Sequence, residues 1–225
     1  MGARSPRRRA GSAALTDVVD LVRSVKGPRP ILSRDAEAAL SARQREVLDA
    51  LHELFAGGFA HLTMADMAAA VSCSLRTLYE LAPGKDDLVR LVVDRRLWSI
   101  GRSATSALRT EMQPLDAIRA HLHAAHEAIA GMTEAFGADA AADPGTNEIN
   151  TAHAQYLVDV TRALLDEALR RGQIGLVDTA AVARVMANVG ADFAAPEVLG
   201  SLSSPPKVAA DAIVDLVLTG LRTTA

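Results

Sequence analysis

The stretch Thr63 to Lys85, TMADMAAAVSCSLRTLYELAPGK, constrains the fold more than any other part of the chain. Its first Thr is followed three residues later by Asp66, a spacing typical of a helical capping box, and this predicts a short helix over 64–71. The next residues break the pattern, and Ser74 predicts the N-cap of a second helix over 75–81. Two short helices joined by a tight turn are therefore expected.

The second of these helices has an apolar face and an unusual outer face. Leu78 and Leu81 are three residues apart and are expected to point inward, whereas Arg76, Thr77 and Tyr79 are free to project outward. An exposed Arg, Thr and Tyr on one short helix indicate contacts with DNA. The alternative is an ordinary helical hairpin whose polar face is only solvated.

From about Ser41 to Leu88 the chain resembles the helix-turn-helix domain of the tetracycline-repressor-like (TetR) family of transcriptional regulators. The resemblance rests on Leu54-Phe55, Gly58-Phe59, Thr63, Met67-Ala68, Cys73-Ser74, Thr77-Leu78-Tyr79 and Lys85. The chain departs from the family pattern in three places. Ser72 stands at the usual turn glycine, Arg76 replaces a small residue before the Thr, and Leu81-Ala82 replaces a frequent His-Phe pair.

These residues give a specific hypothesis for DNA contacts. Arg76 is expected to read a guanine edge and Leu75 to meet a thymine methyl, whereas Thr77, Tyr79 and Lys85 are expected to bind phosphates. The full set of expected DNA-binding residues is Arg43, Thr63, Ser74, Leu75, Arg76, Thr77, Tyr79 and Lys85.

The composition favours an all-α protein. The chain has 225 residues, only 3% aromatic side chains, and abundant Ala and Leu. Its one cysteine, Cys73, excludes an intrachain disulfide and fits a reducing cytoplasm. The sequence has no apolar run of the ~18 residues needed to span a bilayer, so no membrane segment and no signal peptide are expected.

Positive charge is concentrated at the N-terminus although the net charge is −3. Residues 1–34 carry eight Arg or Lys against two Asp, a balance of +6, which leaves −9 for the rest. Residues 1–32 are therefore expected to form a basic, partly disordered arm that either lies along DNA or acts as a solubilising tail. An apolar pattern over 13–25 indicates a short accessory helix within it.

The rest of the chain shows helical periodicity and no strand pattern. A helix-turn-helix DNA-binding domain is expected over 33–88, with a bracing first helix that starts near Ser33 or Ser41 and ends at Ala56, and a helical effector-binding and dimerisation domain over 89–225. Further helices are expected over 85–108, 114–136, 147–171, 178–195 and 205–222, with a loop through Asp143-Pro144-Gly145.

The last helix carries apolar residues over more than one stripe, which predicts burial on two sides. The resemblance implies that the last two helices, 178–195 and 205–222, form the interface of a homodimer. Such a dimer would read a palindromic operator with half-sites about 34 to 36 Å apart. Burial of both faces within one subunit is the alternative.

The resemblance also implies a small-molecule effector pocket among the middle helices, for which an apolar or aromatic ligand is expected. The candidate lining residues are Trp98, Met112, Met132, Phe136, His153, Tyr156, Met186 and Phe193, although such residues at helical spacing are more often plain core. His121, His123 and His126 do not have convincing ligand spacing, and Asp139, Asp143 and Glu148 are interpreted as solvated loop acids, so no metal is expected.

The expected function is a DNA-binding repressor that an effector releases from its operator. The sequence has no catalytic constellation and predicts no cofactor and no enzyme activity. Two alternatives remain: a helical adaptor that binds protein through its terminal helices, and an all-helical enzyme that uses the histidines of the middle helices.

Overall fold

The computed structural model describes residues 17–130 and 133–222. Within these ranges the chain is helical and has no β-strand, and an isolated antiparallel bridge joins Ile174 to Arg222. The elements in chain order are α1 (Val18–Ser24), α2 (Arg34–Ala39), α3 (Ala42–Phe55), α4 (Met64–Ala70), α5 (Leu75–Leu81), α6 (Lys85–Ser106), α7 (Pro114–Ala130), α8 (Glu134–Ala142), α9 (Pro144–Arg170), α10 (Thr179–Ala194), α11 (Pro196–Leu199) and α12 (Pro206–Leu221). The predicted all-α class is confirmed.

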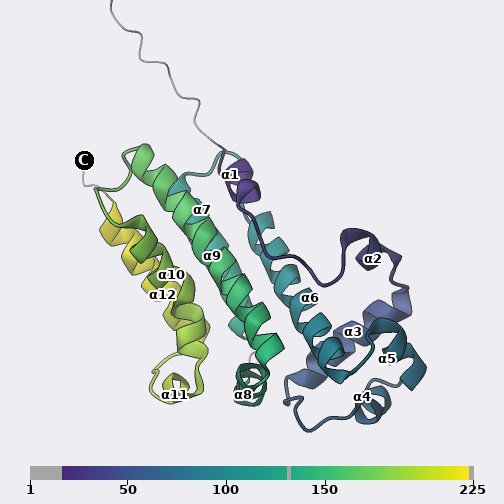
Figure 1. Cartoon of the computed structure of the whole chain (residues 1–225). Helices are drawn as coiled ribbons and strands as arrows, with labels where there is room; N and C mark the ends of the chain where they lie inside the picture. Colours follow the sequence, from purple (N-terminus) through teal and green to yellow (C-terminus); the bar gives the residue numbers. More distant parts are fainter. Residues whose placement is uncertain (1–16, 131–132, 223–225) are drawn as a thin grey trace, which may run out of the picture.

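The helices form two groups that α6 joins (Figure 1). Helices α3, α4 and α5 lie at one end, and α7, α9, α10 and α12 form a bundle at the other. The core of the smaller group includes Phe55, Met67 and Leu78, and continues along α6 as far as Val93. Because α6 also packs on α7 and α9 of the bundle, it connects the two groups.

Helices α3, α4 and α5 begin at the predicted residues because their caps are encoded locally, although α4 ends at Ala70, one residue before its predicted end. Ser33 caps α2 and Ser41 caps α3, so the two starts considered for the bracing helix are both helix N-termini. Thr63 caps α4 through a capping box, and α5 has the predicted bounds.

Two predictions for the middle of the chain are wrong. The helix expected over 114–136 is two helices, α7 and α8, because the Thr133 hydroxyl accepts the amide of Phe136 and starts a new helix. The loop expected through Asp143-Pro144-Gly145 is instead the start of α9. Asp143 accepts the amide of Thr146 as the N-cap, and Pro144 occupies the first turn, where its missing N–H costs nothing.

The described part of the expected basic arm, 17–32, does not precede the helix-turn-helix as a free arm. Val18 and Val22 on α1 are fully buried against the bundle, where α1 packs on α9. Residues 25–32, called the strap below, then run along the molecule towards α2 (Figure 1). The apolar stripe of α1 explains this placement, since it needs a hydrophobic surface to cover it.

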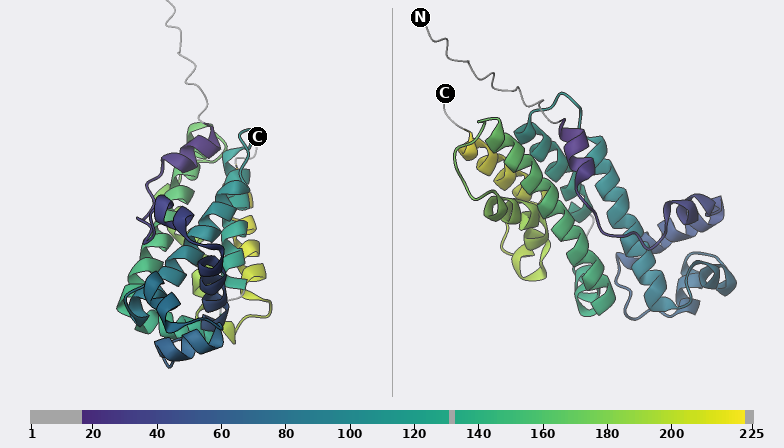
Figure 2. Two further views of the ribbon diagram at one scale, coloured as in Figure 1. Left: turned by 90° about the vertical axis from the view of Figure 1, so that its right-hand side faces the viewer. Right: turned by 45° about the horizontal axis from the view of Figure 1, so that its top comes forward.

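The two long C-terminal helices lie side by side at the edge of the molecule opposite α3 to α5 (Figure 2). α12 packs on α7 and α10, and α10 packs on α9. None of the described helices combines the length and the apolar character needed to cross a membrane.

Candidate nucleic-acid interface and effector site

The outer face of α5 carries exposed side chains that have no packing role. Ser74 caps the helix by accepting the amide of Thr77, and Leu78 fixes the inner face with no exposed surface. On the outside, Leu75 is 43% and Tyr79 55% exposed. Large hydrophobic side chains are seldom left this exposed on a short helix without a partner, so this face is a candidate binding surface.

Arg76 projects from the same helix and forms an ion pair with Glu80. Its Nε donates to Oε1 of Glu80 at 2.9 Å, and its side chain remains 88% exposed. The hydrogen bond to Glu80 raises the pKa of the Arg76 guanidinium, which is charged at neutral pH in any case. Arg76 therefore presents a full positive charge on the outer face.

The turn between α4 and α5 is a Schellman motif with a serine in the left-handed position. Ser72 has φ +51°, the amide of Cys73 donates to the carbonyl of Ala68, and the amide of Ser72 donates to that of Ala69. Arg43 on α3 braces this turn, since its guanidinium donates to the carbonyl of Ser72 at 2.7 Å and also pairs with Glu46. Arg43, a predicted contact residue, thus holds the turn that leads into α5.

Thr63 and Lys85 also make contacts within the protein. The Thr63 hydroxyl and amide both bond to Asp66, and these bonds lower the pKa of that carboxyl. The ammonium group of Lys85 donates to the carbonyl of Ala60 at 2.6 Å, in the loop between α3 and α4. A lysine has three donors, so this bond leaves others for a phosphate.

Sequence reasoning missed the acid that holds the same loop from the other side. Asp139 on α8 accepts the backbone amides of Phe59 and Ala60 at 2.5 and 2.7 Å, so its interpretation as a solvated loop acid is wrong. The Thr133 hydroxyl donates to the carbonyl of Ala56 in the same region. These contacts join residues about 80 positions apart and leave no local sequence signal, whereas Asp143 could have been identified from the Pro that follows it.

The expected effector residues do not converge on one cavity. Trp98, His153 and Tyr156 lie together between α6 and α9, with ring centroids of Trp98 at 5.3 Å from His153 and 6.4 Å from Tyr156. Burial raises the pKa of Tyr156. The carboxylate of Asp94, which sequence reasoning did not select, accepts a hydrogen bond from this group through Nε2 of His153 at 3.2 Å.

The other candidates are dispersed. Met186 is fully buried in the bundle core and Phe193 packs against that core. Phe136 packs edge-on against Phe59 at 6.0 Å, in the core of the smaller helical group. Met112 lines an open cavity of about 930 Å³ beside α1, and Met132 lies outside the described residues.

The three histidines of α7 contribute to structure. His121 is buried, and its burial lowers its pKa to about 4. His126 contacts the carboxylate of Asp211 on α12 through Nδ1 at 2.7 Å, and His123 approaches Asp215 at 3.5 Å. Among the residues that the structure describes, no group of three or more His, Cys, Asp or Glu could hold a metal ion.

Comparison with solved structures identifies the fold. No protein-family model matches the sequence, and a search of curated proteins gives no significant match. The structure is similar to a TetR transcription regulator from Haloarcula marismortui, with a TM-score of 0.69, 16% identity, and coverage of 82% of this chain and 100% of that one.

Two further regulators support the same assignment. The TetR-family transcriptional regulator from Agrobacterium tumefaciens aligns with a TM-score of 0.64, 18% identity, and coverage of 81% of this chain and 98% of that one. PfmR from Thermus thermophilus, also a TetR-family transcriptional regulator, aligns with a TM-score of 0.58, 21% identity, and coverage of 83% and 100%. The chain therefore has the fold of the TetR-family transcriptional regulators.

Proposed function

We propose that this protein is a cytoplasmic, homodimeric transcriptional regulator that binds a palindromic DNA operator and acts as a repressor released by a small molecule. The proposal depends mainly on the outer face of α5, where Leu75, Arg76 and Tyr79 are exposed. The inner face of this helix is buried in the core and its N-terminus is capped, so its orientation is fixed. A helix held in this way enters the major groove as the second helix of a helix-turn-helix.

The side chains of α5 have separate roles in this proposal. Arg76 reads a guanine through two parallel hydrogen bonds, once it exchanges Glu80 for the base, and Leu75 contacts a thymine methyl. Thr77, Tyr79 and Lys85 bind phosphates and set the register. Arg43, Thr63 and Ser74 act mainly through the fold. Arg43 bonds to the turn before α5, Ser74 caps α5, and Thr63 caps the preceding helix α4.

The outer face of the C-terminal helices supports a homodimer. On α12, Val208, Ala212 and Leu216 recur every fourth residue and are all exposed, and Val185 on the neighbouring α10 is 62% exposed. Residues four apart lie on one face of a helix, so they form a continuous apolar stripe. A second copy related by a two-fold axis would cover this stripe and place two α5 helices on successive half-sites.

Effector control follows from the connection that α6 makes between the two helical groups. The first half of α6 belongs to the core that α3, α4 and α5 form, and α6 also packs on α7 and α9 of the bundle. A ligand that shifts α6 changes the separation of the two α5 helices, provided that it binds one separation better than the other.

The first test is selection of binding sites from a random DNA library with the purified full-length protein at moderate salt. The wild type should enrich a palindrome, and an Arg76→Ala, Tyr79→Ala double variant should not. Loss of a bidentate arginine contact alone weakens binding to the correct base by about tenfold or more. Arg102→Ala, which removes an exposed arginine of α6, is the matched control.

Each result has a clear meaning. Enrichment by the wild type and by Arg102→Ala alone supports sequence reading by α5. Equal enrichment by the double variant would contradict the proposed reading face. The absence of any enriched sequence would favour a helical adaptor that binds protein.

A further inference from the structure

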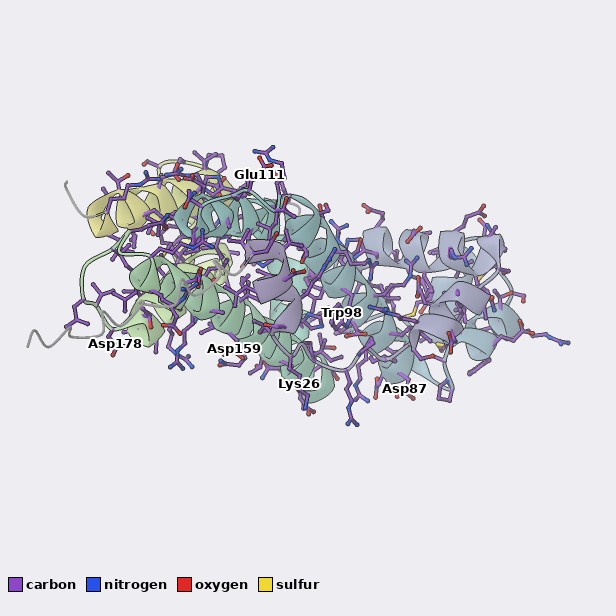
Figure 3. The ribbon with its side chains drawn as sticks, turned by 90° about the horizontal axis from the view of Figure 1, so that it is seen from above. Lys26, Asp87, Trp98, Glu111, Asp159 and Asp178 are labelled. Atoms are coloured by element: carbon purple, nitrogen blue, oxygen red, sulfur yellow. The ribbon has the colours of Figure 1, made fainter. Side chains whose placement is uncertain are left out.

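The strap lies over a small group of polar and aromatic side chains on α6 and α9. The amide of Ile31 donates to Oδ2 of Asp94 at 2.8 Å, and a Cβ placed on Gly27 would lie 3.1 Å from the Trp98 ring and 3.6 Å from the Tyr156 ring. Figure 3 shows Trp98 near the segment that carries Lys26. A side chain at position 27 therefore requires the Trp98 ring or the strap to shift by a few tenths of an ångström, and a branched side chain requires more.

The strap itself is lightly held. Residues 26–30 are all partly or fully exposed, in contrast to the buried Val22 before them. Gly27 contributes only backbone to the contact with Trp98. Val25 and Leu32, at the two ends of the strap, pack against the two cores. Because residues 26–30 bury little apolar surface, this middle part can separate from the bundle at a low free-energy cost while the ends stay in place.

The group beneath the strap, called the strap-covered cluster below, consists of Asp94, Trp98, His153 and Tyr156. Asp94 is only 4% exposed, and its Oδ1 contacts Nε2 of His153. Trp98 stands edge-on to His153, with an angle of 78° between the rings, and is tilted by 40° to Tyr156. A buried carboxylate thus contacts one ring, His153, which packs against Trp98, and Trp98 in turn packs against Tyr156.

One buried polar atom of this cluster lacks a hydrogen bond within the described structure. The indole Nε1 of Trp98 is buried, with no hydrogen-bond partner among the described residues. The guanidinium of Arg95, the next residue on α6, already pairs with two carboxylates, those of Glu37 and Asp49. Imidazole is a weaker base than guanidinium, and a buried carboxylate favours a full cationic partner.

We propose that the strap-covered cluster is a binding site for planar organic cations and that the strap is its lid. A flat amidinium or guanidinium group would replace the Ile31 amide on Asp94 with two charge-assisted hydrogen bonds, and its aromatic part would lie against Trp98 and Tyr156 in the space that the strap occupies. The unpaired indole N–H would meet a hydrogen-bond acceptor on larger ligands of this class.

A series of contacts connects the strap to α3, the helix that braces α4 and α5. The strap is followed directly by Ser33, the N-cap of α2, and Glu37 on α2 pairs with Arg95 of α6. Arg45 on α3 donates to the carbonyls of Glu37 and Ala38. A regulatory effect through this path rests on the proposed DNA-binding function, whereas ligand binding itself does not.

The binding test uses benzamidine and the fluorescence of Trp98, which is the only tryptophan of the chain. A dissociation constant on the order of 1 mM is expected for so small a ligand. Benzamide, a neutral isostere, and benzoate, an anion, should bind at least about tenfold more weakly, because neither supplies the positive charge. Asp94→Asn should weaken benzamidine binding by a similar factor, and Asp159→Asn, at an exposed acid of α9, should not.

Several results would overturn the site. No fluorescence change at about 10 mM benzamidine, roughly ten times the expected constant, would do so. Equal binding of benzoate, or unchanged binding by a folded Asp94→Asn variant, would also do so. If circular dichroism shows that Asp94→Asn is unfolded, comparison of the three ligands on the wild type still decides the charge requirement.

The lid is tested by hydrogen exchange of the backbone amides. Benzamidine should speed exchange of the Ile31 amide, because this amide loses its acceptor on Asp94. Gly27→Val should lift the strap from Trp98, speed the same exchange without ligand, and tighten benzamidine binding severalfold. Gly175→Val is the control, since a Cβ at Gly175 meets no atom within 4 Å.

Binding of benzamidine with unchanged or slower exchange at Ile31 would overturn the lid. Neither measurement contains DNA, so failure of the operator selection would leave this result intact. Conversely, a protein that selects a palindrome but ignores benzamidine would retain the proposed function and lose this site.

Discussion

Arg76 and Glu80 are neighbours on the outer face of α5, with Nε of the guanidinium 2.9 Å from Oε1 of the carboxylate. The pair is exposed on both sides, so water and salt screen it and little free energy is needed to separate it. In the proposed DNA complex, Arg76 can therefore exchange this partner for a base, and Glu80 would bring a negative charge close to the phosphates.

The first prediction is that Glu80→Gln strengthens DNA binding. Removal of the charge frees Arg76 and reduces repulsion from the phosphates, so operator affinity should rise about two- to fivefold at moderate salt. Fluorescence anisotropy with the selected operator measures this change, and Glu53→Gln, at an exposed acid of α3, is the control. Weaker binding by Glu80→Gln would mean that the ion pair positions Arg76 for reading.

The second prediction concerns the contact between α8 and the loop after α3. Gly58 has φ +88°, and a Cβ there would lie 3.0 Å from Oδ2 of Asp139, the atom that holds the amides of Phe59 and Ala60. Gly58→Ala should therefore lower the free energy of unfolding by about 1–3 kcal/mol, from backbone strain and displacement of the carboxylate.

Gly57→Ala is the matched control for this change. A Cβ at Gly57 would make only an ordinary contact of 3.6 Å with the carbonyl of Leu54. Urea unfolding of both variants measures the difference. Equal stability of Gly57→Ala and Gly58→Ala would show that the loop adjusts freely and that Asp139 does not fix it.

Local signals explain why helices α3, α4 and α5 could be predicted almost to the residue. Each short helix carries its own capping side chain, and the breaks between helices fall at turn residues. Ser72 shows the limit of this reasoning. The resemblance marked its position as a usual glycine, and the structure places a serine there with the same left-handed backbone.

The bundle was less predictable because its contacts join distant parts of the chain. Asp94 bonds to Ile31, 63 residues earlier, and Asp139 bonds to a loop about 80 residues earlier. Apolar periodicity identified α1 as a helix but not the surface it covers. Met186 and Trp98 were equivalent pocket candidates in the sequence. In the structure Met186 fills the core and Trp98 lies beneath the strap, a difference that depends on tertiary packing alone.

The third prediction is a loss of stability in mild acid. Burial lowers the pKa of His121 from 6.5 to about 4. Between these two pH values the imidazole is therefore protonated in the unfolded state and neutral in the folded state. The stabilising contribution is complete above pH 6.5 and is lost as the pH falls towards 4, by up to about 3 kcal/mol. Urea unfolding at pH 7, 6 and 5 measures this slope.

His121→Leu is expected to flatten the slope between pH 6.5 and 4, whatever its effect on stability at pH 7. Part of the slope should remain, because burial also lowers the pKa of His126 and of His52. His61→Leu, at an exposed histidine, is the control and should keep the wild-type slope. An unchanged slope in His121→Leu would mean that this imidazole is accessible to protons in the folded state.

The last prediction is that Leu216→Glu converts the protein to a monomer. Leu216 is 68% exposed on the outer stripe of α12, so a carboxylate is tolerated in one free subunit but would be buried without a partner in the proposed dimer. Multi-angle light scattering should give the mass of a dimer for the wild type and for Ile31→Glu, which changes an exposed residue of the strap. Because each half-site is read by one subunit, the Leu216→Glu monomer should also lose preference for the full palindrome while it keeps weak affinity for a half-site. A dimer that survives Leu216→Glu would place the interface on another face of the bundle and change the expected distance between the two α5 helices.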